Sequence, residues 1–246
     1  MLILDKRIIL VTGASRGIGL AIVKRLASEG AIVFAGMRNE SNIMENEDVS
    51  SIDGKVIPIK LDVCDKESIK KCILEIKKMY GKLDVLVNNA GIMITGRMEM
   101  ASDDAVDKVF NTNVFGLLHV SQMAIRLLKK SDAGTIINIS SILGDVGDIG
   151  QTVYAASKAA VSSMTRTWAR EYAPMGIRVN AIAPGNTDTD MFNMIDDDKL
   201  EDAIALIGLG RLAKPDEIAK VALFLASTMS SYVTGEIIGV NGGLIL

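Results

Sequence analysis

The sequence of 246 residues contains little cysteine and almost no histidine: two Cys and one His. Cys64 and Cys72 stand eight positions apart and no CxxC pair exists, so the residues of a usual zinc site or of a disulfide framework are missing. We therefore expect no metal site, and we expect both thiols to be reduced in a cytoplasmic protein. The lone histidine, His119, lies in an apolar helical stretch, where a buried or edge position is the simplest interpretation.

The sequence also lacks an excess of positive charge and a long apolar run. Its 27 Lys and Arg residues face 30 Asp and Glu residues, whereas a nonspecific nucleic-acid binder needs surplus cations to replace phosphate counterions. No uncharged apolar run approaches the roughly 18 residues of a membrane-spanning helix. Asp5, Lys6 and Arg7 interrupt the N-terminal apolar stretch, which breaks the pattern of a signal peptide. We expect a soluble protein that binds neither nucleic acid nor membrane.

The composition favours a folded core, because hydrophobic residues make up 49% of the chain and charged residues 23%. Short apolar runs rich in β-branched residues alternate with segments of helical spacing. Each run is predicted to be a strand buried on both faces, since a half-exposed strand would alternate polar and apolar residues. The predicted strands are 7–12, 31–35, 56–61, 85–88, 135–139, 178–182 and 236–240, and the predicted helices are 18–29, 66–80, 101–128, 152–173 and 215–227.

This alternation implies parallel strands joined by right-handed helical crossovers. It predicts an α/β fold: a single doubly wound Rossmann domain over residues 1–246, with a seven-stranded parallel sheet flanked by helices. The segment 186–212 departs from this alternation between two well-defined elements, because it carries Asp188, Asp190, Asp196, Asp197 and Asp198 with Met191, Phe192, Met194 and Ile195. Two interpretations stay open for it, a lid over a substrate and a tolerated surface insertion.

A glycine-rich turn follows the first predicted strand. Gly13, Gly17 and Gly19 lie in the stretch 12–19, Thr-Gly-Ala-Ser-Arg-Gly-Ile-Gly, which leads directly into the first predicted helix. Glycine lets the backbone turn tightly and approach a phosphate, and the free N–H groups of a helix N-terminus attract negative charge. The spacing differs from the common GxGxxG fingerprint. Its position between a strand and a helix at the start of an alternating chain still favours a dinucleotide site.

A basic residue follows the second predicted strand. In dinucleotide sites a carboxylate binds the 2′-hydroxyl of NAD, and a cation accommodates the 2′-phosphate of NADP. Arg38 stands where that carboxylate would lie, Arg16 lies in the glycine turn, and the nearest acid, Glu40, falls two residues further on. The sequence therefore favours NADP(H). The alternative is that both arginines are ordinary solvated surface charges.

Tyr154 and Lys158 are four positions apart, so a helix places both on one face. The pKa of a phenol is near ~10, and a neighbouring ammonium favours the phenolate, which would bring the pKa of Tyr154 towards neutrality. Ser141 follows the buried run 135–139, at the sheet edge where ligands bind, and its hydroxyl could donate a hydrogen bond to a carbonyl oxygen. Without a histidine nearby, serine hydrolase chemistry does not fit. The alternative for the Tyr-x-x-x-Lys spacing is a surface pair.

Further motifs accompany these residues along the whole chain: Asn88-Asn89-Ala90-Gly91, Asn113 in Asn-Thr-Asn-Val, Pro184-Gly185, and the closing Val240-Asn241-Gly242-Gly243. In this order the set resembles the short-chain dehydrogenase/reductase family. The resemblance implies that Tyr154 is the acid/base that protonates the alkoxide and that Lys158 lowers the pKa of Tyr154 and holds the nicotinamide ribose. It also implies that Ser141 orients the carbonyl and that Asn113 holds a water in a proton relay.

The resemblance implies a set of cofactor contacts as well. Asp62 would meet the adenine ring, Asn88 and Gly91 would line the adenosine side, and Thr187 and Thr189 would meet the nicotinamide carboxamide. The complete predicted set for NADP(H) is Gly13, Ser15, Arg16, Gly17, Ile18, Gly19, Arg38, Asp62, Val63, Asn88, Ala90, Gly91, Tyr154, Lys158, Pro184, Gly185, Thr187 and Thr189.

Within the family the pattern is most similar to the bacterial 3-oxoacyl-[acyl-carrier-protein] reductases, through Gly210-Arg211-Leu212, Pro215-Asp216-Glu217 and Tyr232-Val233-Thr234-Gly235. This similarity implies an NADPH-dependent carbonyl reductase of fatty acid biosynthesis that reduces a 3-oxoacyl thioester, with acyl carrier protein as a candidate partner. Hydroxysteroid, sugar and small-ketone dehydrogenases share these stretches and stay open as alternatives. A non-catalytic NADP-binding scaffold is the alternative from a different class.

Two stretches depart from the carrier-dependent reductases. Their arginines for the acidic carrier precede the strands that lead to Ser141 and to Pro184, where this chain has Lys129-Lys130 and Met175. The stretch 92–96 is also more apolar than expected. Members of the family are commonly homotetramers, paired through helices that correspond to 101–128 and 152–173 and through C-terminal strands. The apolar tail 243–246 fits such an assembly, and packing on its own sheet is the alternative.

Overall fold

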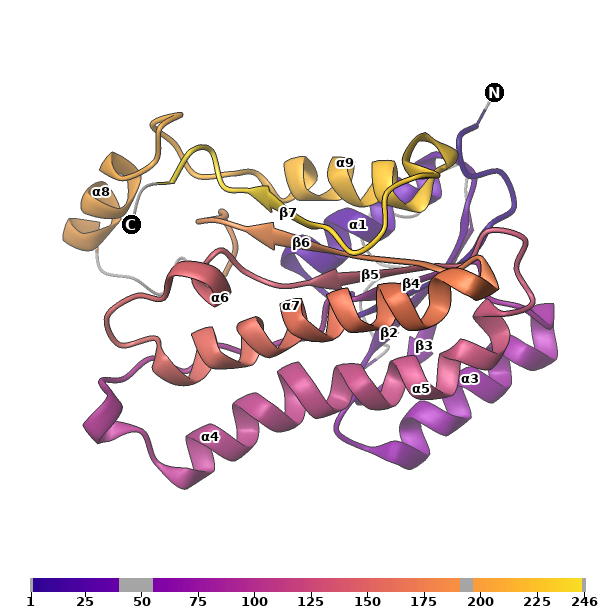
Figure 1. The fold of residues 1–246 in the computed structure, drawn as a ribbon, viewed down its shortest axis with the longest axis horizontal. Helices are drawn as coiled ribbons and strands as arrows, with labels where there is room; N and C mark the ends of the chain where they lie inside the picture. The colour runs from indigo at the N-terminus through magenta and orange to yellow at the C-terminus, as the bar shows by residue number, and fades with distance from the viewer. Residues whose placement is uncertain (1, 40–54, 191–196, 245–246) are drawn as a thin grey trace.

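The computed structural model describes residues 2–39, 55–190 and 197–244. Its centre is a sheet of seven parallel strands in the order β3-β2-β1-β4-β5-β6-β7 (Figure 1). This order confirms the predicted doubly wound sheet. The strands are β1 (Ile8–Thr12), β2 (Ile32–Met37), β3 (Lys55–Lys60), β4 (Val85–Asn88), β5 (Thr135–Ile139), β6 (Arg178–Pro184) and β7 (Ile237–Val240).

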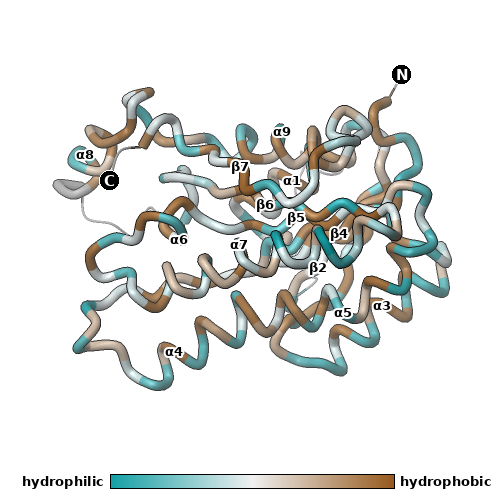
Figure 2. The backbone as a smooth tube through the Cα atoms, viewed as in Figure 1, coloured by the Kyte–Doolittle hydropathy of each residue, from teal (hydrophilic) through white to brown (hydrophobic). Residues whose placement is uncertain are grey.

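Helices cover both faces of the sheet (Figure 1). One face carries α1 (Gly17–Ser28) and α9 (Pro215–Ala226), which pack against each other. The other face carries α3 (Lys66–Tyr80), α5 (Leu117–Leu128) and α7 (Thr152–Tyr172). Along these helices hydrophobic and hydrophilic residues alternate (Figure 2), as expected where only one side of a helix faces a core.

Both faces of the central strands are buried, because helices cover each of them. Consecutive side chains of a strand point to opposite faces and so enter different clusters. Val11 and Val87 belong to the apolar cluster under α1 and α9, whereas their neighbours Leu10 and Leu86 belong to the cluster under α3, α5 and α7. The continuous apolar runs of the sequence reflect this burial. The prediction of two-sided burial is wrong for β3 and β7, whose residues are mostly half-buried, because each has only one neighbouring strand at an edge of the sheet.

The predicted helix 101–128 is interrupted. It consists of α4 (Asp103–Phe110), a π-helical turn, η2 (Asn111–Gly116), and α5. A π-helical turn is wider than an α-helical one and is often found at functional sites. Two contacts accompany it: the amide of Asn113 bonds to the backbone of Ile92, and Gly116 lies so close to Val63 that a Cβ there would approach it to 2.9 Å. Helical periodicity cannot reveal such a local widening.

Several short helical segments were not expected from the sequence. They are η1 (Met98–Met100), α6 (Leu143–Val146), η3 (Ala173–Met175), η4 (Thr228–Ser230) and α8 (Asp197–Ala205). All but α8 are too short to show a helical period. The helix α8 lies inside the segment 186–212, of which residues 191–196 lie outside the described part of the chain.

The buried carboxylate of Asp84 joins the starts of two strands. It accepts hydrogen bonds from the backbone N–H of Ile8 at 2.8 Å, from the hydroxyl of Ser131 at 2.5 Å and from the ammonium of Lys82 at 3.0 Å. Burial alone would raise the pKa of Asp84, but these three hydrogen bonds and the charge of Lys82 together lower it. The ionised carboxylate therefore belongs to the folded structure.

Replacing Asp84 by Asn should destabilise the protein at pH 7 by about 1–3 kcal/mol, because buried donors lose a charged acceptor. The folded-state pKa of Asp84 is lowered, so its contribution is present above the unfolded-state pKa near ~3.9 and is lost as the pH falls through the folded-state pKa. The free energies of unfolding of wild type and Asp84→Asn, measured in urea, should thus differ most at pH 7 and become equal below pH 4. The exposed control Asp132→Asn should match wild type, and equal stability of Asp84→Asn and wild type at pH 7 would contradict this account.

Candidate active site

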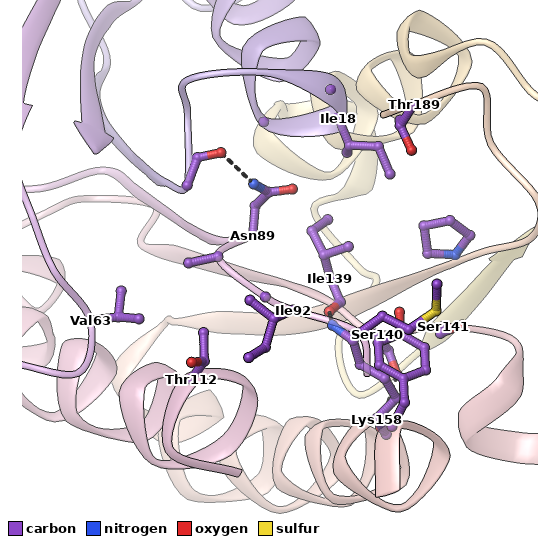
Figure 3. Close-up of a pocket in the computed structure, with 18 of the residues that line it drawn as sticks. Ile18, Val63, Asn89, Ile92, Thr112, Ile139, Ser140, Ser141, Lys158 and Thr189 are labelled. Atoms are coloured by element: carbon purple, nitrogen blue, oxygen red, sulfur yellow. Dashed lines mark hydrogen bonds between the residues drawn. The ribbon is translucent and has the colours of Figure 1, made fainter. Parts of the chain in front are cut away.

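A cavity of about 880 Å³ lies along the carboxyl ends of the central strands. In this class of sheet ligands bind there, beside the point where the strand order reverses, which here lies between β1 and β4. In the cavity (Figure 3), Val63 and Thr112 lie on the side away from Ser141 and Lys158. The predicted site residues in its lining are Gly13, Ser15, Arg16, Gly17, Ile18, Gly19, Arg38, Asp62, Val63, Ala90, Gly91, Ser141, Tyr154, Lys158, Pro184, Gly185, Thr187 and Thr189.

The glycine turn supplies a cradle for an anion. Gly13 and Gly17 adopt positive φ angles of 64° and 54°, and a Cβ on Gly19 would stand 2.2 Å from the carbonyl oxygen of Gly13, so a side chain there would displace backbone. The residue before α1, Arg16, makes no capping hydrogen bond through its side chain. The first N–H groups of α1 therefore stand without a side-chain cap beside the cavity. By contrast, Asp65 caps α3.

The loop after β4 is tied to this turn by Asn89, which the sequence analysis did not select. Its side-chain amide donates to the carbonyl oxygens of Thr12 at 2.9 Å and of Gly13 at 3.0 Å. Figure 3 shows one hydrogen bond from this amide. The Thr12 hydroxyl in turn accepts from the backbone N–H groups of Asn89 and Ala90. The turn and the loop thus hold each other at close range. Asn89 is the first residue beyond the strand, a position from which a side chain can reach the cavity edge.

The prediction that Asn88 lines the cavity is wrong. As the last residue of β4 it points into the core, where it is 3% exposed and donates to Ser121 on α5 and to Asn138 on β5, both at 2.9 Å. The Oδ1 atom of Asn88 is buried and has no hydrogen-bond partner. Its neighbours Ala90 and Gly91 do line the cavity, because the chain leaves the sheet after Asn88.

Two arginines border one end of the cavity. Arg38 follows β2 directly and is exposed. Arg16 forms an ion pair with Asp190 at 2.9 Å, in which both side chains are about two-thirds exposed. An exposed pair of this kind stabilises weakly, so Arg16 can exchange Asp190 for another anion at little cost. Glu40, the nearest acid in sequence to Arg38, lies outside the described residues.

The other end of the cavity brings Tyr154 and Lys158 on α7 next to Ser141 after β5. The Lys158 ammonium lies 5.7 Å from the centroid of the Tyr154 ring and donates to the carbonyl oxygen of Ile139 at 2.8 Å. Burial lowers the pKa of Lys158 to about 8. Burial also raises the pKa of Tyr154, which a hydrogen bond with Ser141 opposes only in part. The two groups and Ser141 form one polar cluster.

The expected lowering of the pKa of Tyr154 by Lys158 is therefore wrong for this structure. Two causes account for it. Desolvation disfavours the phenolate, and the Lys158 ammonium is held by the Ile139 carbonyl instead of pairing with the phenol oxygen.

Asn113 lies behind the cavity wall. Its side chain is 1% exposed, accepts from the Ile92 N–H, and donates to the Ile92 carbonyl and to the Ser157 hydroxyl. A Cβ on Gly91 would lie 3.3 Å from Asn113 Oδ1 and 3.5 Å from Lys158 Nζ, so these two groups stand next to each other beneath Gly91. The amide of Asn113 is thus already bound to protein groups. Its predicted role in a water relay stays a prediction.

A second wall of the cavity was missed by the sequence analysis. It contains Cys64, Lys66, Thr112, Phe115 and His119, which come from the loop before α3, the first residue of α3, η2 and α5. Burial and the charge of Lys66 lower the pKa of His119. No sequence motif marks these residues, because only the π-helical turn and the helix contacts bring them to the cavity.

Across the described residues, no group of three or more His, Cys, Asp or Glu side chains is arranged to hold a metal ion. In the same part of the chain, no helix combines the length and the apolar character needed to cross a membrane.

Comparison with known proteins decides the family. A family model described as enoyl-(acyl carrier protein) reductase matches residues 13–245. The chain belongs to the short-chain dehydrogenase/reductase family. It is 44% identical over 244 residues to the 3-oxoacyl-[acyl-carrier-protein] reductase of Thermotoga maritima, which covers 99% of both chains. The enzymes of the same description from Vibrio harveyi and Escherichia coli are 40% identical over 243 residues (99% of both chains) and 38% identical over 242 residues (98% of both chains).

Family membership makes the chain an oxidoreductase that works with a nicotinamide cofactor. The residues of the cavity fit such a group: the uncapped N-terminus of α1 and the glycine turn can receive its pyrophosphate. The polar cluster of Ser141, Tyr154 and Lys158 lies in the same cavity.

The lowered pKa of Lys158 predicts an unusual dependence of stability on pH. An unfolded lysine has a pKa near ~10.4, so between about pH 8 and 10 the unfolded chain binds more protons and the free energy of unfolding rises with pH. Relative to Lys158→Met, wild type should gain roughly 2–3 kcal/mol over this range in urea unfolding. The exposed control Lys60→Met should follow wild type. If the free energy of unfolding depends on pH in the same way for wild type and Lys158→Met, the lowered pKa of Lys158 is refuted.

Proposed function

We propose that the chain is an NADPH-dependent reductase of the 3-oxo group of acyl thioesters. One observation carries the proposal: the hydroxyls of Ser141 and Tyr154 and the ammonium of Lys158 meet in the cavity that also holds the glycine turn. The names of the three relatives compared above, each a 3-oxoacyl-[acyl-carrier-protein] reductase, support the thioester. Hydroxysteroids, sugars and small ketones are the alternative substrates.

In this proposal each residue of the polar cluster has a separate role in the reduction of the carbonyl. The bound nicotinamide supplies the hydride. Ser141 donates a hydrogen bond to the carbonyl oxygen and stabilises the charge that develops there. Tyr154 transfers its hydroxyl proton to that oxygen, so the product is an alcohol. Lys158 stabilises the resulting phenolate and holds the nicotinamide ribose, and Asn113 continues the proton path behind Gly91.

The remaining predicted contacts follow the cavity lining. Asp62 and Val63 bind the adenine, and Ala90 and Gly91 line the adenosine side. Thr187 and Thr189 hold the nicotinamide carboxamide. The other lining residues proposed as cofactor contacts are Gly13, Ser15, Gly17, Ile18, Gly19, Pro184 and Gly185.

The polar cluster favours carbonyl reduction over reduction of a carbon–carbon double bond, which the description of the family model names. Two hydroxyls, those of Ser141 and Tyr154, converge on one place. A carbonyl oxygen that becomes an alkoxide needs a hydrogen-bond donor and a proton donor at the same atom. These two hydroxyls meet that need together.

Replacing Tyr154 by Phe should leave NADPH binding intact, because the ring remains, and should lower ketone reduction roughly 10²- to 10⁴-fold through loss of the proton donor. Lys158→Ala should damage both binding and turnover. The assay follows NADPH absorbance with an acetoacetyl thioester and with steroid, sugar and small cyclic ketones. Tyr172→Phe, at the far end of α7, is the matched control and should behave as wild type.

Full activity of Tyr154→Phe on any of these ketones would exclude the proposed mechanism. A wild-type protein that binds NADPH and reduces none of them would instead indicate the non-catalytic scaffold.

We propose NADP(H) in preference to NAD(H), because Arg38 and Arg16 border the cavity and Arg38 directly follows β2. Arg38→Asp should weaken NADPH binding at least about tenfold and leave NADH binding equal or tighter, since a charge-assisted bond to the 2′-phosphate is lost. Titration calorimetry with both cofactors measures this. Arg97→Asp, the same charge reversal outside the cavity lining, should change neither affinity. Equal affinities of wild type for NADPH and NADH would contradict the proposed preference for NADP(H).

Acyl carrier protein is the proposed partner. Lys129 and Lys130, exposed at the end of α5, supply cations for an acidic carrier, whereas the half-exposed Met175 supplies none.

The free thiols of Cys64 and Cys72 are in keeping with a reducing, cytoplasmic setting. The single domain 1–246 and the substrate lid 186–212 stay predictions. In support of the lid, Asn186, Thr187, Thr189 and Asp190 line the cavity.

We propose a homotetramer paired through the helical segments 101–128 and 152–173 and through the C-terminal strands. Phe115 of η2 is 47% exposed and β7 is half-buried at the sheet edge, so both offer apolar surface to a second copy. Light scattering at micromolar concentration should report four chains. A mass of one 26.3 kDa chain would refute the assembly.

A further inference from the structure

An apolar surface lies outside the cavity on the two loops that lead away from the polar cluster. We name it the mouth shelf and define it by Ile94, Met98, Met100, Val146 and Ile149, which are 36%, 72%, 75%, 55% and 85% exposed. The first three follow β4, and the last two belong to or follow α6. Neither the fold nor the proposed chemistry of the carbonyl accounts for five such side chains in water.

The mouth shelf is continuous with the cavity. Ile92 and Met93 line the cavity and Ile94 follows them, while Leu143 lines it and begins α6, which contains Val146. A hydrogen bond of 2.8 Å from the N–H of Gly96 to the carbonyl of Gly150 joins the two loops. In Figure 1, α6 and the start of α4 lie at the same end of the molecule. A molecule whose carbonyl reaches Ser141 and Tyr154 can therefore extend over this surface.

The charges around the mouth shelf restrict what can lie on it. Its two loops contain three carboxylates, of Glu99, Asp145 and Asp148, and one guanidinium, of Arg97, all on exposed residues. A phosphate or a carboxylate would be repelled there. A sugar would need polar partners and aromatic platforms, and the sequence of 92–100 and 143–150 contains no aromatic residue. The surface suits an uncharged apolar group.

We infer that the mouth shelf binds the alkyl chain of the 3-oxoacyl substrate and makes the enzyme select longer chains. This inference rests on the proposed function. Methionine side chains are flexible and adapt to chains of different length, which suits Met98 and Met100 for such a surface. Each methylene removed from water contributes up to about fourfold in affinity, and an open surface covers only one side of the chain. The expected gain from four to twelve acyl carbons is thus about 10- to 100-fold in kcat/KM.

The test compares 3-oxobutanoyl, 3-oxooctanoyl and 3-oxododecanoyl thioesters of N-acetylcysteamine, below their micelle concentrations, with saturating NADPH. For wild type, kcat/KM should rise along the series, mainly through a lower KM, because the shelf binds ground state and transition state alike. The double variant Met98→Ser with Ile149→Ser should lose most of this rise and keep the wild-type value for the four-carbon substrate. Met229→Ser, at a 58% exposed methionine on η4 outside the mouth shelf, is the control and should keep the full rise.

The inference is overturned if kcat/KM of wild type does not rise with acyl chain length, or if the rise remains in the double variant. Either result leaves the proposed function intact. Absence of reduction for every thioester, the four-carbon one included, is a failure of the proposed function instead. A steroid ketone that loses rate in the double variant while the thioester series stays unchanged overturns the assignment to an alkyl chain. A lower mass of the double variant by light scattering, with a changed four-carbon rate, assigns the surface to a second copy and also overturns it.

Discussion

The close tie between the glycine turn after β1 and the loop after β4 is the contact on which the site depends. Four hydrogen bonds connect Thr12 and Gly13 with Asn89 and Ala90 across the place where the strand order reverses. Glycine is required on one side because a Cβ on Gly13 would lie 2.8 Å from the Cα of Ala90. The tie sets the distance between the α1 N-terminus and the loop that leads to Ile92, which in turn holds Asn113.

Burial acts on the two titrating groups of the polar cluster in the same sense, towards their neutral forms. It lowers the pKa of Lys158 to about 8 and raises that of Tyr154 above its ordinary value, so the phenol holds its proton more tightly than the ammonium does. The phenol of Tyr154 therefore keeps its proton at neutral pH, which is the form that the proposed proton donor needs. The Ile139 carbonyl at the end of β5 and the Ser141 hydroxyl two residues further on orient the pair. The end of β5 and the residues after it thus position the two titrating groups that α7 carries.

Much of the fold could be predicted from the sequence. The strands 85–88 and 135–139 and the helix 66–80 agree to the residue, because burial on both faces or on one helical stripe leaves a periodic pattern. The π-helical turn, the inward direction of Asn88 and the raised pKa of Tyr154 could not be predicted. Each depends on contacts between segments distant in sequence: Asn113 with Ile92, Asn88 with Ser121, and the desolvation of Tyr154 by its surroundings. Motifs identify the residue types of the site, whereas tertiary packing decides which of two adjacent asparagines reaches it.

The missing side-chain cap of α1 links folding to the supply of ligand. A helix end without a cap leaves N–H groups that an anion can satisfy, so a bound nucleotide completes α1 as well as filling the cavity. Because a ligand that binds only the folded chain stabilises it by RT ln(1 + [L]/Kd), the folded fraction follows the nucleotide concentration. In a cell, a fall in the nucleotide pool would expose more of the chain to proteases, and the abundance of the protein would report the metabolic state in which it works.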